Sequence, residues 1–261
     1  MNKNLVVVKD NKLIQASYKL SLIEQRIVLS CIAKIDSTKE LTEGQGFTIT
    51  VSEIQDLMTD NRNIKSLYAD VKEAIEKLWD REIKLDSQGS SRRWIFEKKY
   101  NENEGSVTLH FSPTIIPYLS QLKDNFTKYR LEWVSKFKST NSIRIYELLV
   151  QWTSKGEREV ELEWLKNILL VSDKYPRTNN FIQRVLKPSI DEINEYSNLS
   201  VSYGVRKSGR TITHIQFKFD IKEQSIVKQH QQSITLEQFV RDNPVKTKGK
   251  SEFEVRKLMS K

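Results

Sequence analysis

From Tyr175 to Phe219 the chain reads YPRTNNFIQRVLKPSIDEINEYSNLSVSYGVRKSGRTITHIQFKF. The first half of this stretch has the periodicity of an amphipathic helix. At about 100° per residue, one side collects mostly apolar residues, namely Phe181, Ile182, Val185, Leu186, Ser189, Ile193 and Tyr196. The opposite side collects Arg177, Asn180, Arg184 and Lys187, all in the N-terminal half. This pattern predicts a helix with a basic N-terminal face.

The second half of the stretch predicts a two-stranded hairpin. Segments 199–203 and 211–219 alternate between apolar and polar residues, and they flank a basic tip at 206–210. A basic helix followed by a basic-tipped hairpin is the layout of a DNA-reading winged helix. The alternative for the helix by itself is a surface helix with solvated charges. The helix and the wing together favour DNA binding.

Length and composition bound the class of protein. A chain of 261 residues, 38% hydrophobic and 30% charged, is long enough for one or two soluble globular domains. No apolar run approaches the roughly 20 residues of a membrane span, and the apolar part of the N-terminus is too short for a signal peptide. The single cysteine, Cys31, excludes an internal disulfide and is expected to be a small core residue. We therefore expect a cytoplasmic protein.

The net charge of +9 is unevenly distributed. Residues 1–122 contain 17 Lys and Arg and 17 Asp and Glu, whereas residues 123–222 contain 18 and 12. Residues 223–261 contain 8 and 5. The basic excess coincides with the helix and hairpin, which suggests a polyanionic partner.

The rest of the chain predicts that this unit is the second of two copies. The first copy is expected to contain a helix starting near Ser21, a strand at 47–51, a helix capped by Ser52, a helix from 62 to 81 capped by Asp60 and Asn61, and a hairpin of 92–100 and 106–111. A connecting helix is expected at 113–122. We predict an α+β fold with two tandem winged-helix domains, at 1–122 and 123–222, and a basic, mostly disordered tail at 223–261.

The second copy is expected to repeat the same order. It would contain a short helix at 131–137, a helix capped by Ser139 or Thr140, a strand at 158–162 and a helix at 163–170, before the helix and hairpin described above. Pro188 lies inside the second reading helix and removes a backbone donor. We therefore predict a kink beyond the basic half of that helix.

Enzymatic sites are not evident in the sequence. The chain contains no phosphate-binding G-x-x-x-x-G-K-[ST] loop, no G-x-G-x-x-G and no histidine or cysteine spacing typical of a metal site. The alternating acidic residues near 160 are expected to form the solvated face of a strand: Glu157, Glu159, Glu161 and Glu163. We expect neither a catalytic centre nor a cofactor other than the DNA.

Several segments in order resemble the plasmid replication initiator proteins of the tandem winged-helix superfamily, whose members bind repeated DNA sites called iterons. The similar segments are Leu20-Ser-Leu-Ile-Glu-Gln-Arg-Ile27, Ser142-Ile-Arg-Ile-Tyr-Glu-Leu-Leu149 with Trp152, Tyr175, Asn180-Phe181, Arg184-Val-Leu-Lys-Pro188, Glu192-Ile-Asn194, Lys207-Ser-Gly-Arg210 and Ile215-Gln-Phe-Lys-Phe219. The resemblance covers about residues 5–220 and leaves out the tail.

The resemblance implies a mechanism. Such proteins bind iterons as monomers through both winged helices, promote opening of an adjacent AT-rich segment, and recruit the host initiator and the replicative helicase. Many also form dimers through the first domain and repress their own gene. We therefore expect the chain to bind double-stranded origin DNA, to exist as a monomer and a homodimer, and to have no membrane partner.

Residue roles follow from this resemblance and from the basic pattern. In the second domain the expected contacts are Arg177, Thr178, Asn179, Asn180, Arg184 and Lys187 on the helix and Arg206, Lys207, Ser208 and Arg210 on the wing. In the first domain the candidates are Asn61, Arg62, Lys65 and Ser66, with Arg92 and Arg93 near its wing. Acidic neighbours in the first domain leave a dimer interface as an open alternative there.

Two other functions compete with replication initiation. A transcriptional repressor with two winged helices would share the fold and the DNA contacts without opening an origin. A non-enzymatic interaction module could instead bind an acidic protein through the same basic face. A steep salt dependence and a preference for a repeated duplex site would distinguish DNA binding from that module.

Overall fold

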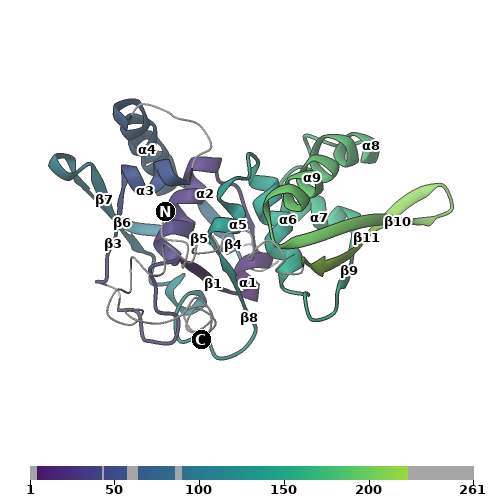
Figure 1. The fold of residues 1–261 in the computed structure, drawn as a ribbon, viewed down its shortest axis with the longest axis horizontal. Coiled ribbons are helices and arrows are strands. Elements are labelled where there is room, and N and C mark those ends of the chain that lie inside the picture. Colours follow the sequence, from purple (N-terminus) through teal and green to yellow (C-terminus); the bar gives the residue numbers. More distant parts are fainter. Residues whose placement is uncertain (1–4, 43, 58–63, 86–89, 223–261) are drawn as a thin grey trace, which may run out of the picture. The chain divides into compact units, whose positions relative to one another are not determined.

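The predicted order of helices and strands occurs twice in the computed structural model, which describes residues 5–42, 44–57, 64–85 and 90–222 (Figure 1). Helices and antiparallel sheets alternate along the chain, so the predicted α+β class is confirmed. None of the helices in the described ranges has the length and apolar character that crossing a bilayer requires.

The first copy has the helix, strand, two helices and hairpin of a winged helix. Its elements are α2 (Leu22–Ile32), β3 (Phe47–Thr50), α3 (Val51–Asp56), α4 (Ile64–Trp79), β6 (Ile95–Asn101), η1 (Glu102–Glu104) and β7 (Ser106–Phe111). The three strands form an antiparallel sheet in the order β3–β7–β6, so that the first strand of the unit pairs with the last.

Capping boxes start two of these helices. The Ser21 backbone N–H donates to the Glu24 carboxylate at 2.8 Å, and the Glu24 N–H donates back to the Ser21 hydroxyl at 3.3 Å. Helix α3 uses Thr50 and Glu53 in the same way. The predicted cap at Ser52 is therefore wrong, because α3 begins at Val51 and Ser52 already lies in its first turn.

The second copy completes the repeat. It consists of α5 (Glu132–Ser135), α6 (Thr140–Val150), β9 (Glu157–Glu161), α7 (Leu162–Ile168), α8 (Thr178–Phe181), η3 (Ile182–Leu186), α9 (Lys187–Tyr196), β10 (Leu199–Ser208) and β11 (Thr211–Ile221). The strands pair in the order β10–β11–β9, which places the first strand again beside the last. The β10–β11 hairpin continues past β9 as a long wing (Figure 1).

Several short elements do not follow from any local pattern. They are β1 (Val6–Asp10), α1 (Asn11–Gln15), β2 (Ser17–Tyr18), β4 (Glu82–Lys84), β5 (Ser91–Arg93) and β8 (Phe126–Arg130). Strand β1 pairs with β8 across the whole first copy, and β2, β4 and β5 form a separate sheet. The β1–β8 and β2–β4 pairs join segments far apart in the sequence, and β4 and β5 are only three residues long, so their own residues do not identify them.

The predicted connecting helix at 113–122 is wrong. The segment is a series of turns with a single 3-10 turn, η2 (Ile116–Tyr118), in which the Tyr118 and Leu119 N–H groups donate three residues back. Pro117 lies at the start of η2 and has no N–H to donate, which disfavours a longer helix through this segment.

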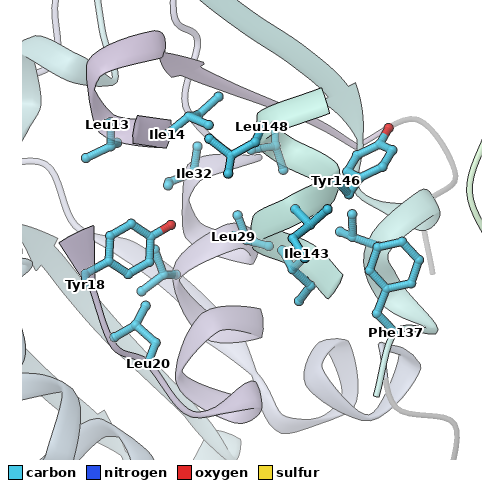
Figure 2. Close-up of a cluster of buried hydrophobic side chains, with 14 of the residues drawn as sticks. Leu13, Ile14, Tyr18, Leu20, Leu29, Ile32, Phe137, Ile143, Tyr146 and Leu148 are labelled. Atoms are coloured by element: carbon cyan, nitrogen blue, oxygen red, sulfur yellow. The ribbon is translucent and has the colours of Figure 1, made fainter. Parts of the chain in front are cut away.

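A single hydrophobic core joins the two copies. Figure 2 shows side chains from the first copy (Leu13, Ile14, Tyr18, Leu20, Leu29 and Ile32) packed with side chains from the second (Phe137, Ile143, Tyr146 and Leu148). Cys31 belongs to the same core, and burial raises the pKa of its thiol to about 12. The expected role of Cys31 as a small core residue is confirmed, since its side chain is completely buried among apolar residues.

Buried ionic groups lie in the same region. Lys9 of β1 forms an ion pair with Glu147 of α6, and both side chains are almost completely inaccessible to solvent. The Tyr129 hydroxyl donates to the same carboxylate at 2.6 Å. Arg144 stacks over the Tyr18 ring at 3.9 Å and donates to the Ala16 carbonyl. Helix α6 is therefore bound to the N-terminal segment by directional contacts as well as by packing.

Candidate nucleic-acid interface

The reading helix of the second copy is formed by α8, η3 and α9 in succession. The apolar side of this helix faces the core, since Phe181, Val185, Leu186 and Ile193 are all buried, and this fixes which side faces outward. The opposite side exposes the predicted set of Arg177, Asn179, Asn180, Arg184 and Lys187, while Thr178 is half-buried at the start of α8. The predicted exposed basic face of this helix is confirmed. Gln183, which the sequence pattern did not single out, is exposed among these residues.

A π-helical turn interrupts this helix. In η3 the Lys187 N–H donates five residues back, to the Ile182 carbonyl. Pro188 follows at once and supplies no N–H of its own. The sequence predicts a kink beyond the basic half, whereas the structure has a π-helical turn inside that half, around Arg184. Such turns displace the side chains that follow them, and they are frequent at functional sites.

The wing ends in a two-residue turn. Ser208 pairs with Thr211, which leaves Gly209 and Arg210 as the loop. Gly209 has φ of 60°, whereas Arg210 does not lie in the positive-φ region. Glycine at the first loop position is typical of a type II′ hairpin, which matches the twist of its strands. Lys207, Ser208 and Arg210 are all exposed at this tip.

Arg206 is held away from the tip by an acidic residue. Its Nε lies 3.1 Å from both carboxylate oxygens of Glu159 on β9, and its Nη2 lies 2.7 Å from one of them. Gln216 of the intervening strand donates to the same carboxylate at 2.8 Å. The hydrogen bond from Arg206 lowers the pKa of Glu159 below its ordinary value of 4.5. The pair is therefore charged at neutral pH, and protonation breaks it only under acid conditions.

The first copy lacks a comparable basic surface in the part that the structure describes. Asn61 and Arg62 lie outside the described residues. Lys65 and Ser66 belong to the first turn of α4, and the Ser66 side chain is exposed. The hairpin tip is acidic, since it consists of η1 with Glu102 and Glu104. Further along α4 the side becomes acidic, as predicted: Glu73 and Glu76 are exposed, Asp70 is half-buried, and exposed Asp80 follows directly after the helix.

Arg92 and Arg93 do not lie on the wing of the first copy. Both belong to β5, which pairs with β4 in a separate sheet, and the wing strand β6 begins only at Ile95. The Arg92 guanidinium donates to the Tyr118 hydroxyl at 3.0 Å and lies over the ring of that tyrosine. The predicted hairpin start at 92 is therefore wrong. Buried Trp94 separates the two strands and ends the alternation between them.

Two family models match the chain. The model described as Initiator Replication protein, WH1 matches residues 6–150, and the model described as Initiator Rep protein, WH2 matches residues 161–219. The chain belongs to the initiator replication protein family. The predicted tandem winged-helix fold is thus confirmed. The predicted division at 122/123 stays a prediction.

Named relatives agree with this family. A replication initiation protein of Escherichia coli is 30% identical over 229 residues, which covers 84% of this initiator and 71% of that protein. The PI protein of Escherichia coli is 25% identical over 264 residues, which covers 85% of each. A crystal structure of Pi initiator protein in complex with iteron DNA matches with a TM-score of 0.73 and 25% identity, over 85% of this initiator and 100% of that chain.

Within the described ranges, no group of three or more His, Cys, Asp or Glu residues is arranged to hold a metal ion. Glu157, Glu159 and Glu161 form the solvated face of β9, as predicted, and Glu159 is the partner of Arg206. Glu163, which the pattern placed on the same strand, lies in α7. What the described surface offers is a basic helix face with a basic wing beside it.

Proposed function

We propose that this initiator starts plasmid replication by binding repeated sites in double-stranded origin DNA. The observation that carries the proposal is the pairing of an exposed reading-helix face with an exposed basic wing tip in one winged helix of a replication-initiator chain. The Pi initiator was crystallised with iteron DNA. We infer the same class of target here.

The second winged helix supplies most of the sequence reading in this proposal. Residues Arg177, Asn179, Asn180, Arg184 and Lys187 enter the major groove, where an arginine can donate two hydrogen bonds to guanine. Thr178 supports the start of the helix. Lys207, Ser208 and Arg210 contact the phosphate backbone or the minor groove, which adds affinity with little sequence information.

The first winged helix divides its surface between DNA and protein in this proposal. Lys65 and Ser66, with Asn61 and Arg62, contact DNA at the start of the helix, and the acidic remainder contacts a second copy in a dimer. The initiator opens an adjacent AT-rich segment and recruits the host initiator and the replicative helicase, which supply the ATPase activity. It acts in the cytoplasm, has no catalytic activity of its own, and represses its own gene as a dimer.

The proposal is tested in two stages. Binding to a labelled duplex with direct repeats from beside the gene is measured by fluorescence anisotropy over a series of salt concentrations. We expect a strong preference over a shuffled duplex and a steep loss of affinity with salt, because several phosphate contacts release counterions. Equal affinity for both duplexes would contradict sequence-specific origin binding.

The second stage separates an initiator from a repressor. The gene is supplied in trans to a plasmid that carries the repeats but no other origin, and transformants are counted. We expect replication only with the intact gene. Specific binding without replication would instead support the repressor. Direct repeats spaced by about two helical turns upstream of the gene would favour initiation, since such spacing puts bound copies on one face of the duplex.

Replacing Glu159 by Gln is expected to tighten binding to any duplex severalfold at low salt. The substitution removes a negative charge beside the wing and releases Arg206 to contact phosphate, which should steepen the salt slope by about one counterion. Glu157→Gln is the matched control, because Glu157 is exposed on the same strand and its substitution removes the same charge. If both variants raise affinity equally without a change in slope, the release of Arg206 is not the cause.

A further inference from the structure

The side chain of Asn194 connects the reading helix to the wing. Its Nδ2 donates to the Val201 carbonyl at 2.8 Å, and its Oδ1 accepts from the Val201 N–H at 2.6 Å. Asn194 lies on α9 and Val201 on β10, two elements that are packed against each other (Figure 1). A side-chain amide that binds both backbone groups of one residue imitates a neighbouring strand.

The position of Val201 explains why such a partner is useful. Strand β10 is an edge strand, since its sheet has the order β10–β11–β9. Backbone groups that point away from β11 have no strand to pair with, and unpaired edge groups need another partner. An amide supplies a donor and an acceptor in one plane, which neither a carboxylate nor a hydroxyl can do in this way. Asn194 is therefore chemically matched to this edge.

The turn between helix and wing is fixed by further hydrogen bonds. The Leu199 N–H donates to the Ser197 hydroxyl at 3.1 Å, and that hydroxyl donates to the Ile193 carbonyl at 2.8 Å. The Tyr146 hydroxyl of α6 donates to the Asn198 side chain at 2.9 Å. These contacts fix residues 197–199, where the chain leaves the helix. Asn194 binds Val201, two residues further along the strand. Both ends of the junction are thus held.

We infer that Asn194 is a positioning residue for DNA binding, which holds the wing at the angle that lets Lys207 and Arg210 contact the same duplex as Arg184. This inference rests on the proposed function. The helix and the wing are two DNA-binding elements on one scaffold. Binding of the helix raises the effective concentration of the wing at the DNA only when the geometry allows both elements to contact the duplex together. Preorganisation of this kind also avoids an ordering cost on binding.

The contribution of Asn194 to folding is separable from this role. The buried side chains of α9, such as Ile190 and Ile193, provide its packing against the core. Asn194 itself is only half-buried. Loss of its amide should therefore leave a folded protein whose wing is less well oriented.

The test compares Asn194→Ala and the isosteric Asn194→Asp with the wild-type full chain, using anisotropy on the repeat duplex over a salt series. Asp keeps the acceptor for the Val201 N–H but loses the donor to its carbonyl. We expect Ala to lower affinity about tenfold and to reduce the salt slope by about two counterions, one for each wing cation. We expect Asn194→Asp also to lower the affinity and to reduce the salt slope.

A double-mutant cycle gives the decisive readout. Lys207→Ala with Arg210→Ala removes both wing cations, and this wing variant should cost much less affinity in the Asn194→Ala background than in the wild type. Ile49→Val, a core change in the first copy, serves as a control for lost stability, because Ile49 is buried away from the junction. Ile49→Val should leave the salt slope of DNA binding unchanged, and its effect should be additive with that of the wing variant.

The outcomes are distinct. An unchanged salt slope and additive effects in both Asn194 variants would overturn the inference, even if affinity fell, because a merely structural role lowers affinity without separating the wing from the helix. A wild-type protein that does not distinguish the repeat duplex from a shuffled one would overturn the proposed function instead.

Discussion

Replacing Glu147 by Ala is expected to lower the free energy of unfolding by about 3–5 kcal/mol, the largest stability change predicted for this initiator. The substitution leaves the buried Lys9 ammonium without its carboxylate and the Tyr129 hydroxyl without its acceptor. An uncompensated buried charge is far costlier than the loss of a surface ion pair. Urea unfolding monitored by circular dichroism measures the change, which should appear as a lower midpoint with an unchanged m-value.

Two controls identify the cause. Glu132→Ala removes a carboxylate that is bonded to the exposed Arg130, and it should cost at most about 1 kcal/mol. The double variant Lys9→Met with Glu147→Leu replaces the buried pair by apolar groups and should recover much of the stability lost in Glu147→Ala, since such replacements are often nearly neutral. If the double variant is as unstable as the single one, lost packing rather than the unpaired charge is responsible.

Replacing Arg184 by Ala is expected to weaken binding to the specific repeat about 5- to 150-fold, which corresponds to about 1–3 kcal/mol for a lost bidentate contact to guanine. Arg184 is exposed inside the π-helical turn of the reading helix, between Asn180 and Lys187. Binding to a shuffled duplex should fall much less, because a phosphate contact alone carries no sequence information. Competition titrations with both duplexes measure the two losses.

Arg130→Ala is the matched control for this prediction. Arg130 is an exposed arginine on β8, outside the reading helix and the wing, and its replacement by Ala removes the same charge. It should weaken both duplexes slightly and equally. An equal loss on specific and shuffled duplexes for Arg184→Ala would show that Arg184 contacts the backbone and does not read bases.

Much of the second winged helix follows from local sequence. The 3.6-residue pattern of the reading helix defines which side packs inward, and the apolar residues Phe181 and Val185 are buried as expected. The alternation in β10 and β11 predicts the hairpin with its basic tip at 206–210. These features depend on neighbours a few residues away, so the sequence is sufficient to predict them.

The predictions that the structure contradicts have a common physical origin. The expected helix at 113–122 and the expected hairpin start at 92 both come from extending a local pattern where a proline or a separate sheet interrupts it. Strands β1 and β2 have little pattern of their own and exist because the distant strands β8 and β4 complete their hydrogen bonds. The sequence predicts a kink beyond the basic half of the reading helix, whereas the π-helical turn lies ahead of Pro188, inside that half.

The sequence by itself determined the order of the main helices and strands in each winged helix, the exposed basic face of the reading helix and the basic tip of the wing. Only the tertiary structure decided which of those charges are available: Arg206 is paired with Glu159, whereas Lys207 and Arg210 remain exposed. It also decided that Lys9 meets Glu147 and that Asn194 binds Val201. The reason is range. Periodicity and capping act between residues a few positions apart, whereas these contacts arise only when packing brings separate elements together.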